Sequence, residues 1–270
     1  MSKINTAYLF DVDGVLTDPR EKRVIETELF TKIIVLLRSQ YAVCLNTGRS
    51  TGWIKKQFIS PLLDRITDKK ILGNFFVIGE KGGAWITFSG DGSMIPGIDK
   101  AISVPEKLNE KVSQLINEKY SEAMFFDDSK KTMISIEMHD GYDLEQFHKW
   151  QTELIKDLEN LLKDSGQTGK YNIDPTIIAT DIENPQAGKA RGADLFLEFL
   201  RYRAIKADRF IAFGDSVSDL EMTDELYRKR QKVEFIFVGD PAKLGEVRKG
   251  YPIQKIGGFS KGTLEYLQQH

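Results

Sequence analysis

Two carboxylates separated by one residue follow a short apolar run near the start of the chain. Residues 7–10 read Ala-Tyr-Leu-Phe, and Asp11, Val12, Asp13 and Gly14 come next. A strand covered by helices on both faces is apolar, and two like charges beside it are unfavourable without compensation. Mg2+ supplies that compensation, because it prefers carboxylate oxygens as ligands. The alternative is a simple strand-to-turn transition, since Asp-Gly is also a common turn signal.

Three further polar clusters fall at the carboxyl ends of predicted strands or at the helix starts beside them. They are Thr47-Gly48-Arg49, Lys189, and Gly214-Asp215-Ser216-Val217-Ser218-Asp219. In a doubly wound sheet, ligands bind in the crevice outside these strand ends. The shared position of the four clusters therefore favours a site over an isolated turn.

The first and last parts of the chain alternate between strand and helix. We expect strands at 7–10, 41–45, 75–78, 210–213 and 234–238, and helices at 26–39, 51–63, 189–203, 219–230 and 261–269. This alternation predicts a parallel sheet with right-handed crossovers.

Between these parts, predicted strands follow one another directly. The expected strands are 84–88, 93–95, 123–126, 132–138 and a pair flanking Asp174-Pro175, and the expected helices are 105–118 and 144–163. This pattern is typical of an α+β domain. We therefore predict an α/β fold: a Rossmann-like doubly wound core of residues 1–82 and 187–270, with residues 83–186 inserted as an α+β cap. Segments 79–83 and 184–188 are the expected linkers.

The composition argues against several classes of function. The 270 residues include 38 Lys+Arg and 40 Asp+Glu, for a net charge of −2, so we expect no nucleic-acid partner. No apolar stretch approaches the length of a membrane span, so we expect no membrane partner. Residues 1–5 lead straight into a strand without a leader pattern. The single cysteine, Cys44, lies in an apolar run, which predicts a buried core thiol in a reducing cytoplasm.

Taken in order, the motifs resemble those of the haloacid dehalogenase (HAD) superfamily. They are Asp-x-Asp-Gly-Val-Leu-Thr from Asp11, the strand-end Thr47, Lys189 at a helix start, and Gly-Asp-Ser-x-x-Asp ending at Asp219. The insert resembles the cap of the Cof-like, sugar-phosphatase subgroup, for which Thr-Gly-Arg is a typical second motif. The resemblance implies Mg2+-dependent phosphoryl transfer on a small phosphorylated metabolite.

The resemblance also assigns roles to residues, and the chemistry of each side chain agrees. Asp11 is the expected nucleophile, since a carboxylate can accept a phosphoryl group. Asp13, on the same side of an extended segment, is the expected acid and base. Metal ligands are expected from Asp11, Asp215 and the backbone carbonyl of Asp13. Asp219 supports the metal indirectly, although a plain helix N-cap is the rival interpretation of that residue.

The phosphoryl oxygens are expected to meet the hydroxyl of Thr47, the backbone N–H of Gly48 and the ammonium of Lys189 at a helix N-terminus. The subgroup commonly has Lys-Gly after a Ser, whereas this chain has Gly188-Lys189-Ala190-Arg191, so Arg191 is the alternative cation.

Candidate substrate contacts are Arg49, Asn184 and Arg191. Two other positions depart from the subgroup's pattern: Glu80-Lys81-Gly82-Gly83 replaces an Asn-Gly pair, and Ser218 stands where Asn is common.

The sequence thus predicts a phosphatase acting on a sugar phosphate or glycosyl-acid phosphate, as a monomer or small homo-oligomer. Two alternatives stay open. A phosphomutase of the phosphomannomutase type would use the same aspartyl-phosphate. The other alternative is a non-catalytic phosphometabolite-binding protein. Binding alone needs no acid/base pair, so the presence of both Asp11 and Asp13 argues against it.

Overall fold

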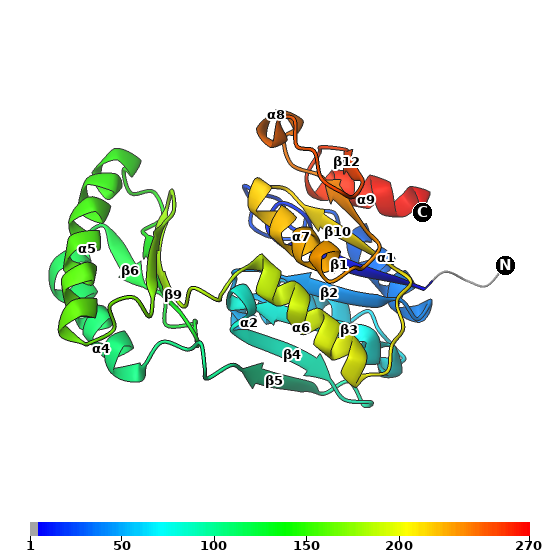
Figure 1. Ribbon diagram of the computed structural model, residues 1–270, viewed down its shortest axis with the longest axis horizontal. Helices are drawn as coiled ribbons and strands as arrows, with labels where there is room; N and C mark the ends of the chain where they lie inside the picture. Colours follow the sequence, from blue (N-terminus) through cyan, green and yellow to red (C-terminus); the bar gives the residue numbers. More distant parts are fainter. Residues whose placement is uncertain (1–4) are drawn as a thin grey trace. The chain divides into compact units, whose positions relative to one another are not determined.

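A computed structural model describes residues 5–270, and the chain forms two compact units (Figure 1). Unit 1 contains the residues up to Gly97 together with Gly188–His270, and unit 2 is Ile98–Ala187. Residues 1–4, on which part of the expectation about a leader peptide rests, lie outside the described residues. The predicted α/β core with an α+β insertion is confirmed as a fold class.

Unit 1 is built on one eight-stranded sheet. Its strands are β1 (Thr6–Phe10), β2 (Ala42–Asn46), β3 (Phe75–Gly79), β4 (Ala84–Phe88), β5 (Met94–Ile98), β10 (Arg209–Gly214), β11 (Val233–Phe237) and β12 (Ile253–Lys255). The strand order is β12-β11-β10-β1-β2-β3-β4-β5. The pairs from β12 through β3 are parallel, and β4 runs antiparallel to β3.

Helices cover both faces of this sheet. They are α1 (Glu28–Arg38), α2 (Thr51–Ile54), α3 (Ser60–Leu63), α6 (Lys189–Tyr202), α7 (Leu220–Arg228), α8 (Pro241–Leu244) and α9 (Ser260–Gln269). In β1, Tyr8 and Phe10 enter the hydrophobic cluster that includes residues of α1 and α9, whereas Ala7 and Leu9 enter the cluster that includes residues of α6 and α7. Both faces of the strand are therefore buried, as its continuous apolar sequence predicted.

The predicted helix over 51–63 is not a single α-helix. A π-helical turn, Lys55–Ile59, separates α2 from α3. Pro61 lies at the first turn of α3, where its missing N–H removes a helical donor and a wider turn accommodates the change.

Unit 2 is an antiparallel sheet with two helices. Its elements are β6 (Met124–Phe126), β7 (Ile134–Met138), β8 (Asn172–Pro175), β9 (Ala179–Glu183), α4 (Glu106–Leu115) and α5 (Leu144–Asp164), and the strand order is β6-β7-β9-β8. One hydrophobic cluster joins the helices to the sheet, including Leu108, Phe147 and Ile182. Asp174-Pro175 lies inside β8, so the expectation of strands flanking this pair was wrong: Pro175 is tolerated because it ends an edge strand.

The expected start of the insertion at residue 83 was also wrong. The β4–β5 hairpin extends the core sheet, and unit 2 begins only at Ile98. Two strands joined by a short turn resemble part of an antiparallel domain in sequence, but such a hairpin also fits the edge of a parallel sheet. The second division, between Ala187 and Gly188, lies one residue from the expected one.

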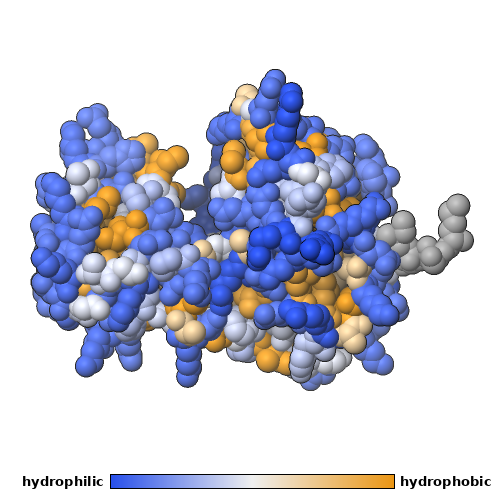
Figure 2. Space-filling view, in the orientation of Figure 1, coloured by the Kyte–Doolittle hydropathy of each residue, from blue (hydrophilic) through white to orange (hydrophobic). Residues whose placement is uncertain are grey.

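The visible face of each unit is mainly hydrophilic, with hydrophobic residues in small groups (Figure 2). Among the described residues, the helices are too short or too polar to cross a bilayer. Cys44 is a buried free thiol in the core, as predicted, and burial raises its pKa.

Candidate active site

Three neighbouring strands of unit 1 bring the predicted site residues to one sheet edge. β1 lies between β10 and β2, and Phe10 is level with Phe213 on one side and Leu45 on the other. The chain leaves these strands at Asp11, Gly214 and Asn46. The strand order reverses at β1, so this edge is the topological switch point where doubly wound sheets bind ligands.

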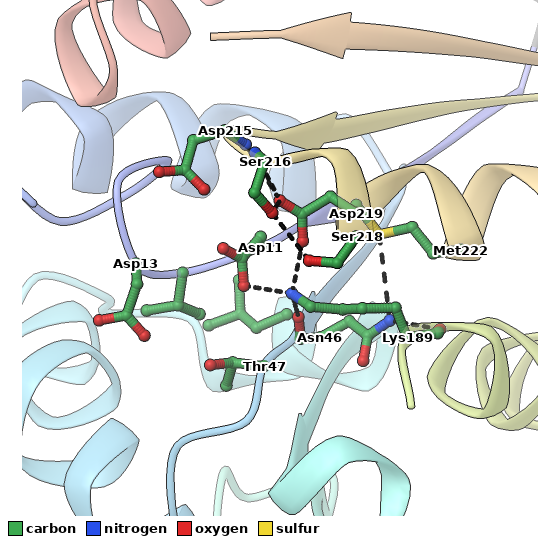
Figure 3. Close-up of polar contacts among 12 residues, drawn as sticks. Asp11, Asp13, Asn46, Thr47, Lys189, Asp215, Ser216, Ser218, Asp219 and Met222 are labelled. Atoms are coloured by element: carbon green, nitrogen blue, oxygen red, sulfur yellow. Dashed lines mark hydrogen bonds and ion pairs between the residues drawn. The ribbon is translucent and has the colours of Figure 1, made fainter. Parts of the chain in front are cut away.

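A carboxylate cluster forms at this edge. Oxygens of Asp11, Asp215 and Asp219 all lie within 4.8 Å of one another (Figure 3). Asp11 and Asp219 are buried and Asp215 is half-buried. Burial raises the pKa of Asp11 well above its ordinary value, although Lys189 acts in the opposite direction. Burial and the charge of Asp219 raise the pKa of Asp215 to about 6.

Lys189 is the cation inside this cluster. Its Nζ donates to Oδ1 of Asp11, to Oδ1 of Asp219 at 2.9 Å and to the carbonyl of Asn46 at 2.8 Å (Figure 3). Burial lowers the pKa of Lys189, but the two carboxylates outweigh burial and the net shift is upward. An ammonium has three N–H donors, so these three protein acceptors use all of them.

Asp219 organises the loop after β10. Its Oδ2 accepts from the backbone N–H of Asp215 at 3.1 Å, from that of Ser216 at 3.0 Å and from Oγ of Ser216 at 2.8 Å. Asp219 makes no N-cap hydrogen bond to α7, but it forms a capping box with Ser216 at the 3-10 turn Val217–Asp219 before that helix. The contacts indicate that Asp219 positions Asp215 and Lys189. The hydroxyls of Ser216 and Ser218 lie 2.9 Å apart in the same loop.

The cluster fits a hard divalent cation. Its donors are carboxylate oxygens of Asp11, Asp215 and Asp219, and the ammonium of Lys189 contacts two of these residues, Asp11 and Asp219. Burial first, and the neighbouring carboxylates second, raise the pKa values of Asp11 and Asp215. Mg2+ prefers such ligands, and its charge would favour their ionised forms.

Asp13 is not a member of the carboxylate cluster; its side chain pairs with Arg49. Nε of Arg49 lies 3.1 and 3.0 Å from the two carboxylate oxygens of Asp13, and Nη2 lies 2.9 Å from Oδ1. The guanidinium also lies over the ring of Trp53, 4.8 Å from its centroid. Such a two-pronged pair fixes the orientation of the carboxylate as well as its place.

Thr47 and Gly48 form the loop after β2. Thr47 is buried, its N–H donates to the carbonyl of Ile78, and its Oγ1 accepts from the backbone N–H of Arg49 at 3.1 Å. Among the described residues, the Thr47 O–H has no acceptor of its own. That proton is therefore suited to an anionic group bound at the loop.

The same fold occurs in solved structures that include a phosphatase and a nucleotidase. The structure is similar to the C-terminal domain of trehalose-6-phosphate phosphatase from C. albicans, with a TM-score of 0.69 and 14% identity over 98% of this chain and 92% of that one. It is similar to Thermoplasma acidophilum 0175, with a TM-score of 0.61 and 16% identity over 99% and 98%. Plasmodium falciparum IMP-nucleotidase gives a TM-score of 0.57 and 15% identity over 88% and 60%.

At these identities the likeness shows a shared fold. No protein-family model matches the chain, and no curated protein matches its sequence. The structural likeness agrees with the family resemblance carried by the four motifs. The motif residues Asp11, Thr47, Lys189 and Asp215 lie together at one edge of the core sheet.

Asn46 was not predicted from the sequence as a site residue. It forms hydrogen bonds with both the side-chain ammonium and the backbone carbonyl of Lys189. The Asn46 carbonyl accepts from the Lys189 ammonium, and its Nδ2 donates to the Lys189 carbonyl at 2.9 Å. Asn46 is fully buried, and Nδ2 also lies 3.9 Å from the sulfur of Met222 in α7. A polar residue ending an otherwise apolar buried strand was the available signal.

The two remaining candidate contacts lie elsewhere. Nε of Arg191 donates to the carbonyl of Gly82 at 3.2 Å, so part of its side chain holds the turn after β3. Lys189, rather than Arg191, is the cation that contacts Asp11. Asn184 lies in unit 2, where its Oδ1 accepts from the N–H of Gln186 at 2.9 Å and stabilises a turn.

Proposed function

We propose that this protein is a Mg2+-dependent phosphatase that hydrolyses a small phosphorylated metabolite through an aspartyl-phosphate. One observation carries the proposal: the strand-end carboxylate of Asp11 is buried against Lys189 and grouped with Asp215 and Asp219. This arrangement gives a nucleophile, a fixed cation and a set of metal ligands in one place. The likeness in fold to phosphatases supports it.

Asp11, Asp215 and the backbone carbonyl of Asp13 would hold Mg2+, whose charge would offset the repulsion between the carboxylate and the phosphate. Asp11 then attacks phosphorus while the bond to the leaving oxygen breaks. Asp13 gives its proton to that oxygen. In the second step Asp13 takes a proton from water, and the water oxygen bonds to phosphorus. The bond between phosphorus and Asp11 breaks, which releases inorganic phosphate and restores the Asp11 carboxylate.

The other residues position the phosphoryl group. The Thr47 hydroxyl and the Gly48 N–H donate to its oxygens, while Lys189 keeps Asp11 oriented and limits the charge of the cluster. Uncatalysed phosphate-ester hydrolysis is so slow that the barrier must fall by roughly 20 kcal/mol. Only several such contacts acting together account for a reduction of that size.

The proposed substrate is a sugar phosphate or a glycosyl-acid phosphate. A sugar phosphate is supported by the family resemblance and by the likeness in fold to trehalose-6-phosphate phosphatase. The fold is also similar to that of IMP-nucleotidase, a protein that is named for a nucleotide. Unit 2 is the proposed specificity cap, with Asn184 as a candidate contact. The buried free thiol of Cys44 supports the cytoplasm as the proposed compartment.

The test is phosphate release from 4-nitrophenyl phosphate with and without Mg2+, followed by a panel of phosphorylated sugars. Asp11→Asn should lower turnover by ~10³-fold or more, because it removes the nucleophile. Asp164→Asn, at an exposed helix end, is the matched control. Equal activity of Asp11→Asn and wild type would disprove the proposal. Isomer interconversion without phosphate release would indicate a phosphomutase instead, and binding without turnover across the panel would indicate a binding protein.

A further inference from the structure

Asn46 contacts Lys189 at the base and at the tip of the lysine. Asn46 ends β2, and it is fully buried. Its Nδ2 donates to the backbone carbonyl of Lys189 at 2.9 Å, while its own carbonyl accepts from the Lys189 ammonium at 2.8 Å (Figure 3). The four-carbon stem of a lysine is flexible, so fixing both of its ends restricts where the ammonium can lie.

The lysine carbonyl does not need the Asn46 amide for its own hydrogen bonding. Lys189 is the first residue of α6, and in an α-helix such a carbonyl accepts from the N–H four residues later. The bond from Asn46 is therefore an additional one to an acceptor of the helix. Its effect is geometric, because it sets the distance between the first turn of α6 and the end of β2.

Two locally unfavourable features meet at this amide. Oδ1 of Asn46 is buried and has no hydrogen-bond partner among residues 5–270, whereas an apolar side chain of the same size would bury no such acceptor. A β-carbon on Gly192 of α6 would lie 2.0 Å from Oδ1, so the amide also requires a glycine, which is unfavourable inside a helix. Local costs of this kind are typical of functional sites.

Backbone hydrogen bonds tie the start of α6 to the same loop independently of the amide. The N–H of Gly188 donates to the carbonyl of Lys81 at 2.8 Å, and the N–H of Lys81 donates to the carbonyl of Thr47 at 3.1 Å. Lys81 has φ 54°, in the left-handed region. We therefore expect α6 to stay docked when the side chain of Asn46 is changed, so that only the finer placement of Lys189 is lost.

We propose that Asn46 is a positioning residue whose side-chain amide holds Lys189 against Asp11. The inference rests on the proposed function for the role of Asp11, and it adds a residue that the four motifs do not contain. The ammonium of Lys189 contacts Asp11, and charge-assisted bonds of this kind depend on alignment. Because Asn46 is buried and acts through the lysine, its loss should lower turnover rather than substrate binding.

The first test is Asn46→Leu, which is close to asparagine in size and removes the amide together with its unsatisfied acceptor. With Mg2+ and 4-nitrophenyl phosphate, kcat should fall about 10-fold or more at an unchanged KM, because a small displacement of a catalytic group slows the reaction. The melting temperature should equal or exceed that of wild type, because no buried group is left without a partner.

The second readout needs no turnover. In protein labelled with 15N at its lysine side chains, a buried ammonium with three protein acceptors should exchange slowly with water and give a resolved NMR signal. Lys189→Met identifies that signal by removing it. In Asn46→Leu the signal should shift by more than its line width or vanish.

A double-mutant cycle separates positioning from general damage. Lys189→Met removes the ammonium, so Asn46 has nothing left to position in this background. Adding Asn46→Leu should then lower kcat by less than about 2-fold, whereas independent structural damage would lower it by the same factor as in wild type.

Asn74→Leu is the matched control. Nδ2 of Asn74 also donates to a backbone carbonyl at 2.9 Å, that of Gln40, but Asn74 precedes β3 and so lies at the other end of the strand from the site. Its kcat, its KM and its ammonium signal should equal those of wild type.

The outcomes separate this inference from the proposed function. Wild-type kcat and an unchanged ammonium signal in Asn46→Leu would overturn the inference, even where the wild type hydrolyses aryl phosphate. A fall in kcat that comes with a lower melting temperature and recurs in full in the Lys189→Met background would assign Asn46 a structural role and also overturn it. A changed ammonium signal in a protein without turnover would support the inference while the phosphatase proposal fails. An unchanged signal in a protein without turnover would overturn both.

Discussion

The α-carbon of Gly14 lies directly against the carboxylate of Asp215. A β-carbon on Gly14 would stand 2.2 Å from Oδ2 and 2.7 Å from Cγ of Asp215, and Gly14 has φ 71°. The Asp-Gly pair near the start of the chain is therefore more than a turn. Its glycine allows the loop after β1 to approach the loop after β10, which brings Asp215 to Asp11.

We predict that Gly14→Ala will weaken the Mg2+ dependence of the protein. The new methyl group must displace the carboxylate of Asp215, so the Mg2+ concentration for half-maximal activity should rise by about 10-fold or more. The left-handed φ adds a stability cost of about 1 kcal/mol. Mg2+ titration of aryl phosphate hydrolysis measures the first effect, and urea unfolding measures the second.

Gly141→Ala supplies the control, since Gly141 has φ 78° and no heavy atom within 4 Å of its added β-carbon. It should show the stability cost with normal Mg2+ dependence. The same Mg2+ response in both variants would show that contact with Asp215 is not the cause.

The parallel sheet explains why much of the site could be predicted from sequence. Asp11 and Asp215 follow apolar strands, and the carboxyl ends of parallel strands meet at one edge wherever those strands pair. The sequence shows which residues follow strands, and the pairing of those strands in the sheet brings the residues together. Lys189 was predictable as a residue at a helix start beside the same edge.

The rest depends on contacts that no local pattern records. In the sequence, Asn46 only marks the end of a predicted strand. Its hydrogen bond to Lys189 forms because α6 packs across β2. The left-handed conformation of Lys81 arises from hydrogen bonds to Thr47 and Gly188, which are distant in sequence. The β4–β5 hairpin has the same alternating pattern whether it joins the core sheet or the insert, so tertiary pairing alone decides its place.

We predict that Gly192→Ala will misplace Lys189. A β-carbon on Gly192 would lie 2.0 Å from Oδ1 of Asn46, so the first turns of α6 must move away from β2. Overpacking of this kind costs about 1–3 kcal/mol of stability, and a shift of about 1 Å at a catalytic group lowers turnover about 100-fold. Denaturant unfolding and steady-state kinetics measure the two effects. Gly73→Ala is the control, because its β-carbon would meet nothing within 4 Å; wild-type kinetics in Gly192→Ala would contradict the prediction.

The raised pKa of Asp215 predicts how the stability of the metal-free protein depends on pH. Its ordinary value is 3.8, and in the folded protein it is about 6. Between these values the folded state binds more protons than the unfolded chain, so the free energy of unfolding falls as pH rises from about 4 to about 6. For a shift of about two units the loss is at most about 3 kcal/mol. Asp11, whose pKa is also raised, acts in the same direction.

Urea unfolding in EDTA across this pH range measures the effect. Asp215→Asn should flatten the curve, and Mg2+ should restore stability to the wild type above pH 6 because it binds the ionised carboxylates. Identical pH dependence for wild type and Asp215→Asn in EDTA would show that Asp215 does not cause the loss.

Loss of the Arg49–Asp13 pair should affect poor leaving groups most. An alkyl phosphate needs a proton on its leaving oxygen, whereas 4-nitrophenolate leaves without one, so a misoriented proton donor matters chiefly for the alkyl ester. We predict that Arg49→Met lowers kcat/KM about 100-fold for an alkyl phosphate and about 10-fold or less for 4-nitrophenyl phosphate. Arg65→Met is the matched control, because Arg65 also lies over an aromatic ring, 4.7 Å from the centroid of Phe30, and has no contact with Asp13. Equal losses for the two esters in Arg49→Met would indicate a general structural effect and reject a role in orienting Asp13.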